Sequence, residues 1–187
     1  ENKEEYSPPT LNNNLQSHLL EIKNIKNNVD IINGTYSNDV ALVENCEELD
    51  LKVSENKKLR GIILYNNSKL RFTVLDSVVV MTRTIRAINL VDSVITISDA
   101  DIRRIELWGC KQIVINIFLS QIQAENVFIL IHHDCENIIL KYGDMKVDLK
   151  DYTPYIEYLN EVKVPNFKEE NKIILARCAK VPLFDIF

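Results

Sequence analysis

A short pattern recurs four times along the chain and limits its fold more than any other feature. In each copy, a small or polar residue stands three places before a run in which every second residue is apolar. Such alternation is typical of a β-strand with one buried face. An apolar pair also precedes each run, so each repeat is expected to contain two strands joined by a turn. The copies are Cys46-Leu49-Leu51-Val53, Asn67-Leu70-Phe72-Val74, Cys110-Ile113-Ile115-Ile117 and Cys135-Ile138-Leu140-Tyr142.

The spacing of the copies, about 20–25 residues, is typical of a solenoid. The longer gap between Asn67 and Cys110 leaves room for a degenerate copy, which the apolar run from Ile88 to Ile97 supplies. There we expect an Asp-Ser step, present at Asp76-Ser77 and again at Asp92-Ser93, to take the place of the small residue. With a capping coil before the first copy, the chain is predicted to form about six coils of two strands each.

The turns of the repeat indicate how its strands are paired. Two-residue hairpin turns of the Asn-Gly or Asp-Gly type are nearly absent, which argues against an antiparallel meander. No long helical segment is present to build βαβ units. Strands stacked on their own next copy are parallel, and parallel crossovers are almost always right-handed. We therefore predict an all-β fold, a right-handed parallel β-helix with a C-terminal strand extension.

Three regions follow from the composition along the chain. Residues 1–14 are polar and contain prolines, which predicts a linker; residues 15–150 are assigned to the β-helix and residues 151–187 to a C-terminal extension. The apolar residues from Leu19 to Ile25 could form a short helix or an imperfect first strand, and a strand is favoured because it would cap the solenoid. In the extension, Lys172–Cys178 is predicted to be a last strand, and an apolar tail follows it.

Composition narrows the classes of function. The net charge of −5 argues against a nucleic-acid partner, and no stretch reaches the roughly 20 apolar residues of a membrane span. Three of the four cysteines hold equivalent repeat positions, where buried free thiols are expected as small hydrophobic groups. Reduced thiols indicate a cytoplasmic location.

Candidates for catalysis are few. Asp99 and Asp101, beside Arg103 and Arg104, could place two carboxylates on one side of a strand, as a polysaccharide-acting β-helix would require; a solvated turn is the favoured interpretation. The run His132–Cys135 suggests a zinc site, but adjacent strand residues point to opposite faces, so a structural role is favoured. No phosphate loop, nucleophile elbow or Cys-x-x-Cys motif occurs. We therefore predict no catalytic residue, no metal, no cofactor and no enzymatic activity.

Several short segments, taken in order, resemble a known family. They are Val40–Cys46, Ile63–Leu70, Ala87–Leu90, Asp134–Glu136, Val164–Phe167 and Lys172–Leu175. Their order and spacing, from about Leu19 to Cys178, are similar to those of the C-terminal β-helix domain of cyclase-associated protein. The chain departs from that family in its longer, more apolar tail and in lacking an upstream WH2-like Leu-Lys-Lys segment.

The resemblance implies a function and two partners. Domains of that family bind actin monomers, preferentially in the ADP form, and promote exchange of ADP for ATP on actin, which recycles actin in the cytoplasm. They also form homodimers by exchanging C-terminal strands. Here the exchanged strand would carry the interface residues Ile173, Ile174, Leu175 and Arg177.

The residues that would contact actin are predicted from the strand alternation. Because Leu49 and Leu51 should face inward, the side chains between and after them should face solvent. Actin is acidic, so outward basic residues are natural candidates. The predicted contact set is Lys52, Arg71, Thr73, Arg104 and Glu106. The alternative within the β-helix class is a tubulin-cofactor-C-like domain that activates a GTPase with an arginine, for which Arg83 is the only candidate.

Overall fold

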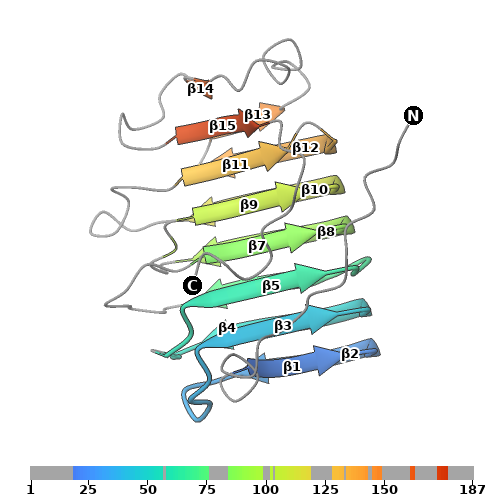
Figure 1. Cartoon of the computed structure of the whole chain (residues 1–187), viewed down its shortest axis with the longest axis vertical. Coiled ribbons are helices and arrows are strands. Elements are labelled where there is room, and N and C mark those ends of the chain that lie inside the picture. Colours follow the sequence, from blue (N-terminus) through green and yellow to red (C-terminus); the bar gives the residue numbers. More distant parts are fainter. Residues whose placement is uncertain are drawn as a thin grey trace.

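The computed structural model places every described strand in one of two sheets that face each other (Figure 1). It describes residues 19–56, 58–75, 84–98, 102, 104–118, 128–132, 134–142, 145–148, 161–162 and 172–176. Sheet A has eight strands, in the order β1 (Leu19–Lys23), β3 (Val40–Glu44), β5 (Gly61–Tyr65), β7 (Thr84–Ile88), β9 (Arg104–Trp108), β11 (Phe128–His132), β15 (Lys172–Ala176) and β14 (Glu161–Val162). Sheet B has seven, in the order β13 (Met145–Asp148), β12 (Glu136–Tyr142), β10 (Lys111–Phe118), β8 (Val91–Ser98), β6 (Arg71–Leu75), β4 (Glu47–Ser54) and β2 (Lys26–Ile32).

From β1 to β12, consecutive strands alternate between the two sheets, so each pair forms one coil of a solenoid. The coils in the described residues are β1–β2, β3–β4, β5–β6, β7–β8, β9–β10 and β11–β12, named coils 1 to 6. All neighbours from coil to coil are parallel. The prediction of an all-β parallel β-helix is confirmed, and residues from Leu19 onward form a strand rather than a helix.

The interior of the solenoid is a continuous apolar core between the sheets. In β4 the buried residues are Leu49, Leu51 and Val53, each at most 1% exposed, whereas Lys52 between them is exposed. In the next coil, Phe72 pairs with Leu51 and is also buried. Each further coil repeats this contact between paired inward side chains, so each coil buries its apolar residues against those of the next coil.

The corner from sheet A to sheet B depends on paired left-handed residues. In coil 2 these are Asn45 (φ 54°) and Glu48 (φ 53°), which flank the buried Cys46. Left-handed backbone is unusual outside glycine, but asparagine tolerates it best. The first position of the corner is held by Asn24, Asn45, Asn66, Asn89 and Gly109, and the second by Asn27, Glu48, Lys69, Asp92, Gln112 and Asn137.

Coil 4 corrects one prediction. The buried corner position is held by Leu90, which follows the left-handed Asn89 and is fully buried, and not by an Asp-Ser step. Ser93 lies inside the solenoid instead, where its hydroxyl accepts a hydrogen bond from Leu70 N at 3.0 Å and donates one to Val91 O at 2.8 Å. The corner therefore requires the left-handed residue more than it requires a small one.

Beyond coil 6 the two sheets end differently. In sheet B, the chain reverses after Tyr142, and β13 pairs antiparallel with β12. In sheet A, β15 pairs in parallel with β11 of the same chain, with Ile129 opposite Ile173 and Ile131 opposite Leu175. Sheet A is thus extended by a strand that comes from the C-terminal extension, and β14 lies antiparallel at its edge.

Candidate protein-binding face

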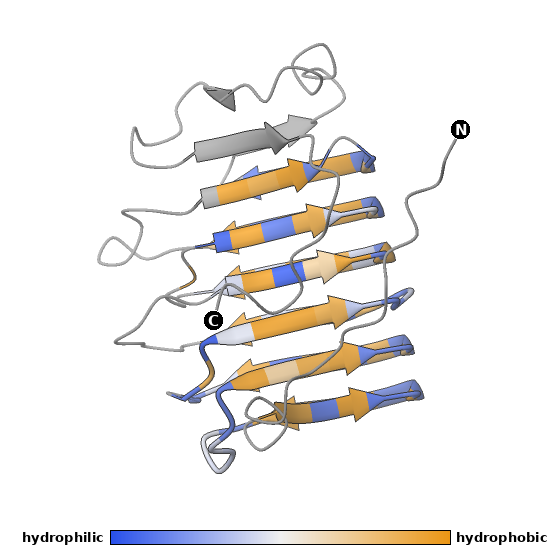
Figure 2. Ribbon diagram, viewed as in Figure 1, coloured by the Kyte–Doolittle hydropathy of each residue, from blue (hydrophilic) through white to orange (hydrophobic). Residues whose placement is uncertain are grey.

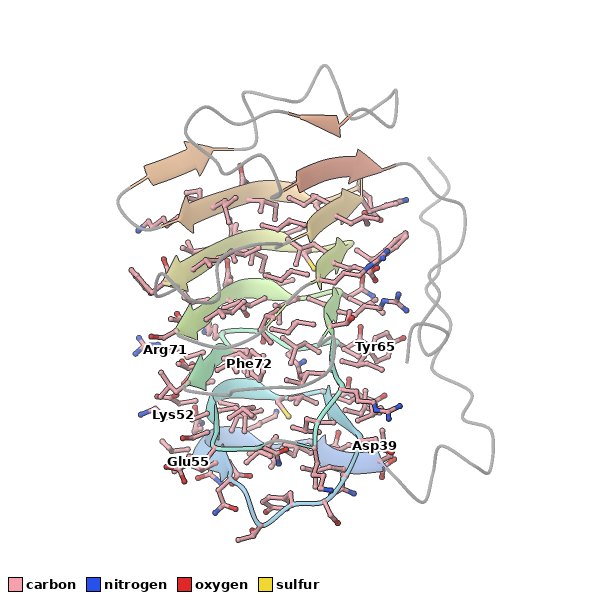
Figure 3. The ribbon with its side chains drawn as sticks, turned by 90° about the vertical axis from the view of Figure 1, so that its left-hand side faces the viewer. Asp39, Lys52, Glu55, Tyr65, Arg71 and Phe72 are labelled. Carbon is pink, nitrogen blue, oxygen red and sulfur yellow. The ribbon has the colours of Figure 1, made fainter. Side chains whose placement is uncertain are left out.

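The outer face of sheet B is open and carries three of the five predicted contact residues. Lys52 and Thr73 are paired across β4 and β6, and Arg71 is paired with Asp50 on the same two strands. Lys52 and Arg71 are exposed, and Thr73 is partly exposed. Figure 3 shows Lys52 and Arg71 projecting from one side of the solenoid, with Phe72 inside it and Tyr65 on the opposite side. The predicted cluster of Lys52, Arg71 and Thr73 is therefore one continuous patch.

A groove of about 760 Å³ lies beside this patch, at the corner where sheet B begins. The groove crosses coils 1 to 4. Each of these coils contributes its second left-handed corner residue and the outward residue two places later, as coil 3 does with Lys69 and Arg71. It is lined by Asn27, Asn28, Val29, Glu48, Leu49, Asp50, Lys69, Leu70, Arg71, Asp92 and Val94.

Exposed apolar side chains border the groove at its coil 1 end. Val29 is 65% exposed and Ile31 is 48% exposed, and both lie on β2, the last strand of the sheet. Val29 pairs with Asp50, and Ile31 pairs with Lys52. Large apolar residues next to charged ones on an accessible face are typical of protein-binding surfaces.

The other two predicted contact residues, Arg104 and Glu106, lie on sheet A, so the structure does not bring them together with the first three. The prediction that Glu106 faces solvent is wrong, because its side chain is 1% exposed. Glu106 forms ion pairs with the fully buried Arg86 and with the partly exposed Arg104. A buried carboxylate between two guanidinium groups has a structural role, since removing its partners would leave a charge in a medium of low polarity.

Although Glu21 and Lys23 of β1 are exposed, six outward apolar side chains of sheet A are buried. They form a second apolar cluster, separate from the core between the sheets, and each is at most 4% exposed. Figure 2 shows the strands of this sheet as mainly hydrophobic, with hydrophilic segments at strand ends and within β1, β7 and β9. The cluster contains Val40, Leu42, Ile63, Tyr65, Ile88 and Trp108.

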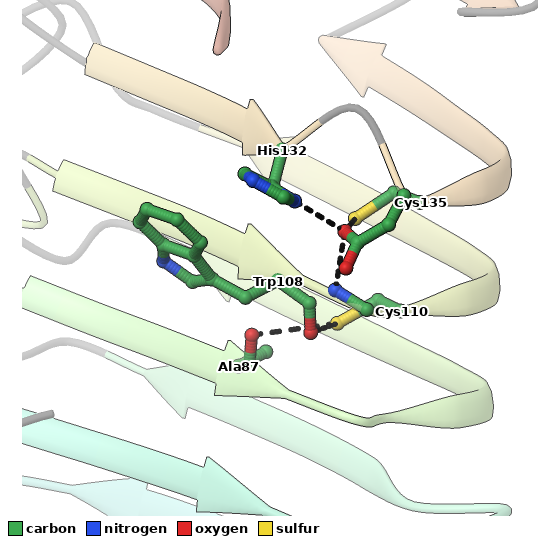
Figure 4. Close-up of polar contacts among 7 residues, drawn as sticks. Ala87, Trp108, Cys110, His132 and Cys135 are labelled. Atoms are coloured by element: carbon green, nitrogen blue, oxygen red, sulfur yellow. Dashed lines mark hydrogen bonds and ion pairs between the residues drawn. The ribbon is translucent and has the colours of Figure 1, made fainter. Parts of the chain in front are cut away.

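His132 and Asp134, at the corner of coil 6, contact residues of coil 5 (Figure 4). His132 is buried and stacked on Trp108, with ring centroids 4.9 Å apart, and its Nδ1 lies 2.6 Å from Asp134 Oδ1. The same oxygen accepts a hydrogen bond from Gly109 N at 2.9 Å. Among the described residues, no three side chains of the metal-binding types come together. These contacts hold the corner of coil 6 against coil 5.

Cys110 and Cys135 hold the same corner position in successive coils. Burial raises the pKa of the Cys135 thiol well above its ordinary value, and the hydrogen-bonded thiol of Cys110 raises it further. Burial also raises the pKa of Cys46 in coil 2. All three described cysteines are free. The raised pKa of Cys46 and of Cys135 makes these two thiols poor nucleophiles at neutral pH.

Other residues from the sequence predictions lie outside the described part of the chain. These are Arg83, Asp99, Asp101, Arg103, His133 and Arg177. For Ile173, Ile174 and Leu175 the structure gives the backbone pairing of β15.

Sequence reasoning missed Lys69, Val29 and Ile31 as parts of the open face. Val29 and Ile31 stand in an apolar run, which predicts a buried strand, but they pair with the outward Asp50 and Lys52 and lie exposed on the outer face of the terminal strand. Lys69 falls in a turn, where charge is ordinary. The detectable signal was that Lys69 and Arg71 are two residues apart, flanking the inward Leu70.

Comparison with protein-family models, with curated proteins and with solved structures found no match for this chain. Within the residues that the structure describes, no helix has the length and apolar character required to cross a membrane.

Proposed function

We propose that this domain binds actin monomers, prefers the ADP-bound form, and promotes exchange of the nucleotide on actin. The observation that supports the proposal most directly is the open outer face of sheet B, where Lys52, Arg71 and Thr73 form a continuous patch. The second support is the order and spacing of segments that resemble the C-terminal domain of cyclase-associated protein. The domain would carry out no chemistry of its own, because actin holds the nucleotide.

The fold suits such a role physically. Strands β4, β6, β8 and β10 of sheet B are each paired in parallel on both sides, so their backbone should change little on binding and lose little conformational entropy. Binding that favours one conformation of actin would alter the rate at which actin releases its nucleotide, since a ligand shifts an equilibrium by its differential affinity for the two states. This mechanism would place the domain in the cytoplasm, associated with the actin cytoskeleton.

Co-elution of the purified domain with ADP-actin and with ATP-actin tests the proposal. We expect a complex with both, stronger with ADP-actin, and faster release of a fluorescent nucleotide from actin when the domain is added. If the domain co-elutes with neither ADP-actin nor ATP-actin, the proposed actin function is refuted, whatever the geometry of the open face.

We also propose that two copies associate by exchanging β15. The support is the long segment between β13 and β15, which includes β14, together with the position of β15 in sheet A between β11 and the edge strand β14. An exchanged strand would repeat, with the partner's β11, the register that β15 makes with β11 in one chain.

A further inference from the structure

Charges in the groove beside sheet B are sorted by coil. Coil 2 contributes Glu48 and Asp50, coil 3 contributes Lys69 and Arg71, and coil 4 contributes Asp92. Successive coils are about 4.8 Å apart, so the groove presents a negative, a positive and a negative band in turn. A partner that fits it must carry the opposite sequence of charges.

The fold explains how these bands arise. The second corner position and the first outward strand residue of a coil stand two residues apart, on either side of an inward residue such as Leu70. Both therefore lie at the same height along the solenoid, and both line the groove. When a coil has charges of one sign at these two positions, as coil 3 does with Lys69 and Arg71, it forms a band of that sign.

The demands of the backbone do not account for the charges. The second corner position is left-handed in every described coil, and asparagine meets that demand at Asn27 and Asn137. Coils 2 and 3 nevertheless carry Glu48 (φ 53°) and Lys69 (φ 50°) there. Their ion pair spans 3.4 Å, and both side chains are at least half exposed, so it contributes at most about 1 kcal/mol to stability. Charged groups of a partner could therefore replace the Glu48–Lys69 ion pair at little cost in stability.

The way in which a partner can bind is limited by the edge of the sheet. On the terminal strand β2, Asn28 Oδ1 accepts a hydrogen bond from Val29 N and Asp30 Oδ1 accepts one from Ile31 N, both at 2.8 Å. These backbone groups are therefore not offered to an added strand. The side chains of Val29 and Ile31 remain exposed on the outer face, so a partner would contact side chains on that face.

Together these observations point to one mode of docking, which rests on the function proposed above and assigns its contact site. We propose that the bound protein places a carboxylate over coil 3, between Lys69 and Arg71, and an apolar side chain against Val29 and Ile31 of coil 1. A basic group of the partner then lies over Glu48 and Asp50. The proposed site is therefore the groove that crosses coils 1 to 4 of sheet B.

Fluorescence anisotropy of labelled ADP-actin monomers, titrated with the domain, tests this mode. We expect the double variant Lys69→Glu/Arg71→Glu to bind at least about tenfold more weakly, because it replaces two attractive charges with repulsive ones. Lys141→Glu is the matched control, since Lys141 is exposed on coil 6 of sheet B and outside the groove; it should change the affinity by less than about twofold.

A second pair of variants tests the apolar part. Val29→Ser/Ile31→Ser should also weaken binding, whereas Phe118→Ser should not, because Phe118 is 49% exposed but lies on coil 5. Thermal melting of each variant checks that it is folded. If the wild-type domain binds and the Lys69/Arg71 double variant binds equally well, this docking mode is wrong while the actin function stands. If the wild-type domain does not bind, both proposals fail.

Discussion

At the scale of single residues, the solenoid depends on left-handed corners that the sequence marks only in part. Asparagine holds the first corner position in coils 1 to 4, and Gly109 holds it in coil 5. A residue branched at Cβ is strained in this conformation, at a cost of about 1–3 kcal/mol. The recurrent Asn before a buried residue was visible in the sequence, but its backbone role was not.

Asn66 (φ 53°) allows a direct test of this corner, because its side chain is exposed and accepts a hydrogen bond from Asn89 at 3.1 Å. We expect Asn66→Val to lower the free energy of unfolding by about 1–3 kcal/mol, and Asn66→Gly to change it much less. Both variants lose the contact with Asn89, so their difference measures the backbone. Urea denaturation gives the values, and equal losses would argue against strain at this position.

The buried ion pair of sheet A leads to a second prediction at this scale. Glu106→Ala would leave the buried charge of Arg86 without this carboxylate, which should lower the free energy of unfolding by about 3–5 kcal/mol. Replacing both partners with apolar residues, Arg86→Met/Glu106→Leu, should recover much of that loss. Urea denaturation of the three proteins tests it; a loss below about 1 kcal/mol in Glu106→Ala would show that the pair is not needed.

The pH dependence of stability follows from the corner thiols. The pKa of Cys135 in the folded state is raised above its ordinary value of 9.0, so the folded protein holds this proton more tightly than the unfolded chain does. The stability that this provides is fully present below about pH 9 and is lost as the pH rises further. Denaturation midpoints between pH 7 and 10.5 should therefore fall above pH 9. They should fall less steeply in Cys135→Ala, and an identical slope would contradict the assignment.

At the scale of the strands, sheet B was predictable and sheet A was not. Strands of sheet B are buried on one face, so alternation in β4 gives the correct inward and outward residues. Strands of sheet A are buried on both faces, as in β5 and β7, and alternation loses its meaning there. Glu106 was assigned to solvent for this reason: its partner Arg86 lies one coil earlier, and nothing local in the sequence connects them.

Leu51→Asp tests the register of β4. Leu51 is fully buried in the ladder between Asp30 and Phe72, so a carboxylate there should cost several kcal/mol and prevent stable folding at 25 °C. Lys52→Asp, one residue along and exposed, is the matched control and should melt close to the wild type. Circular dichroism melting compares them, and a wild-type melting temperature for Leu51→Asp would mean that the register is wrong.

At the scale of the whole molecule, the number of coils was readable because each repeat adds the same two strands. The ends were harder, because they break the repeat. At coil 1, Asn28 and Asp30 pair with Leu49 and Leu51 of β4, so polar residues stand where other coils have core residues. At coil 6, the chain reverses into β13, and Tyr142 opposite Met145 leaves a two-residue connection whose sequence is Gly-Asp. The Gly-Asp dipeptide favours a tight hairpin. The sequence prediction missed this hairpin because it relied on the repeat pattern.

The proposed strand exchange concerns the end of sheet A beyond coil 6. Without β15, the strand β11 would be left with an unpaired edge beside an apolar core, which favours association with another chain. Pairing of β15 within one chain and exchange of β15 between two copies use the same register, Phe128 with Lys172 through His132 with Ala176. The two states therefore make similar contacts at β11 and differ in mass and in the path of the connecting segment.

Light scattering on the intact chain distinguishes them. For exchanged strands we expect the mass of a dimer that persists on dilution, since an interface that includes β15 and its connection should bury more than about 1,000 Å². A chain ending at Asn166, which lacks β15, should lose the dimer and also lose stability, because the edge of β11 is then open. A monomeric mass for the intact chain at micromolar concentration would contradict strand exchange. A dimer that survives the truncation would place the interface on another surface, and the open face of sheet B would then be the first to examine by the Lys69→Glu/Arg71→Glu variant.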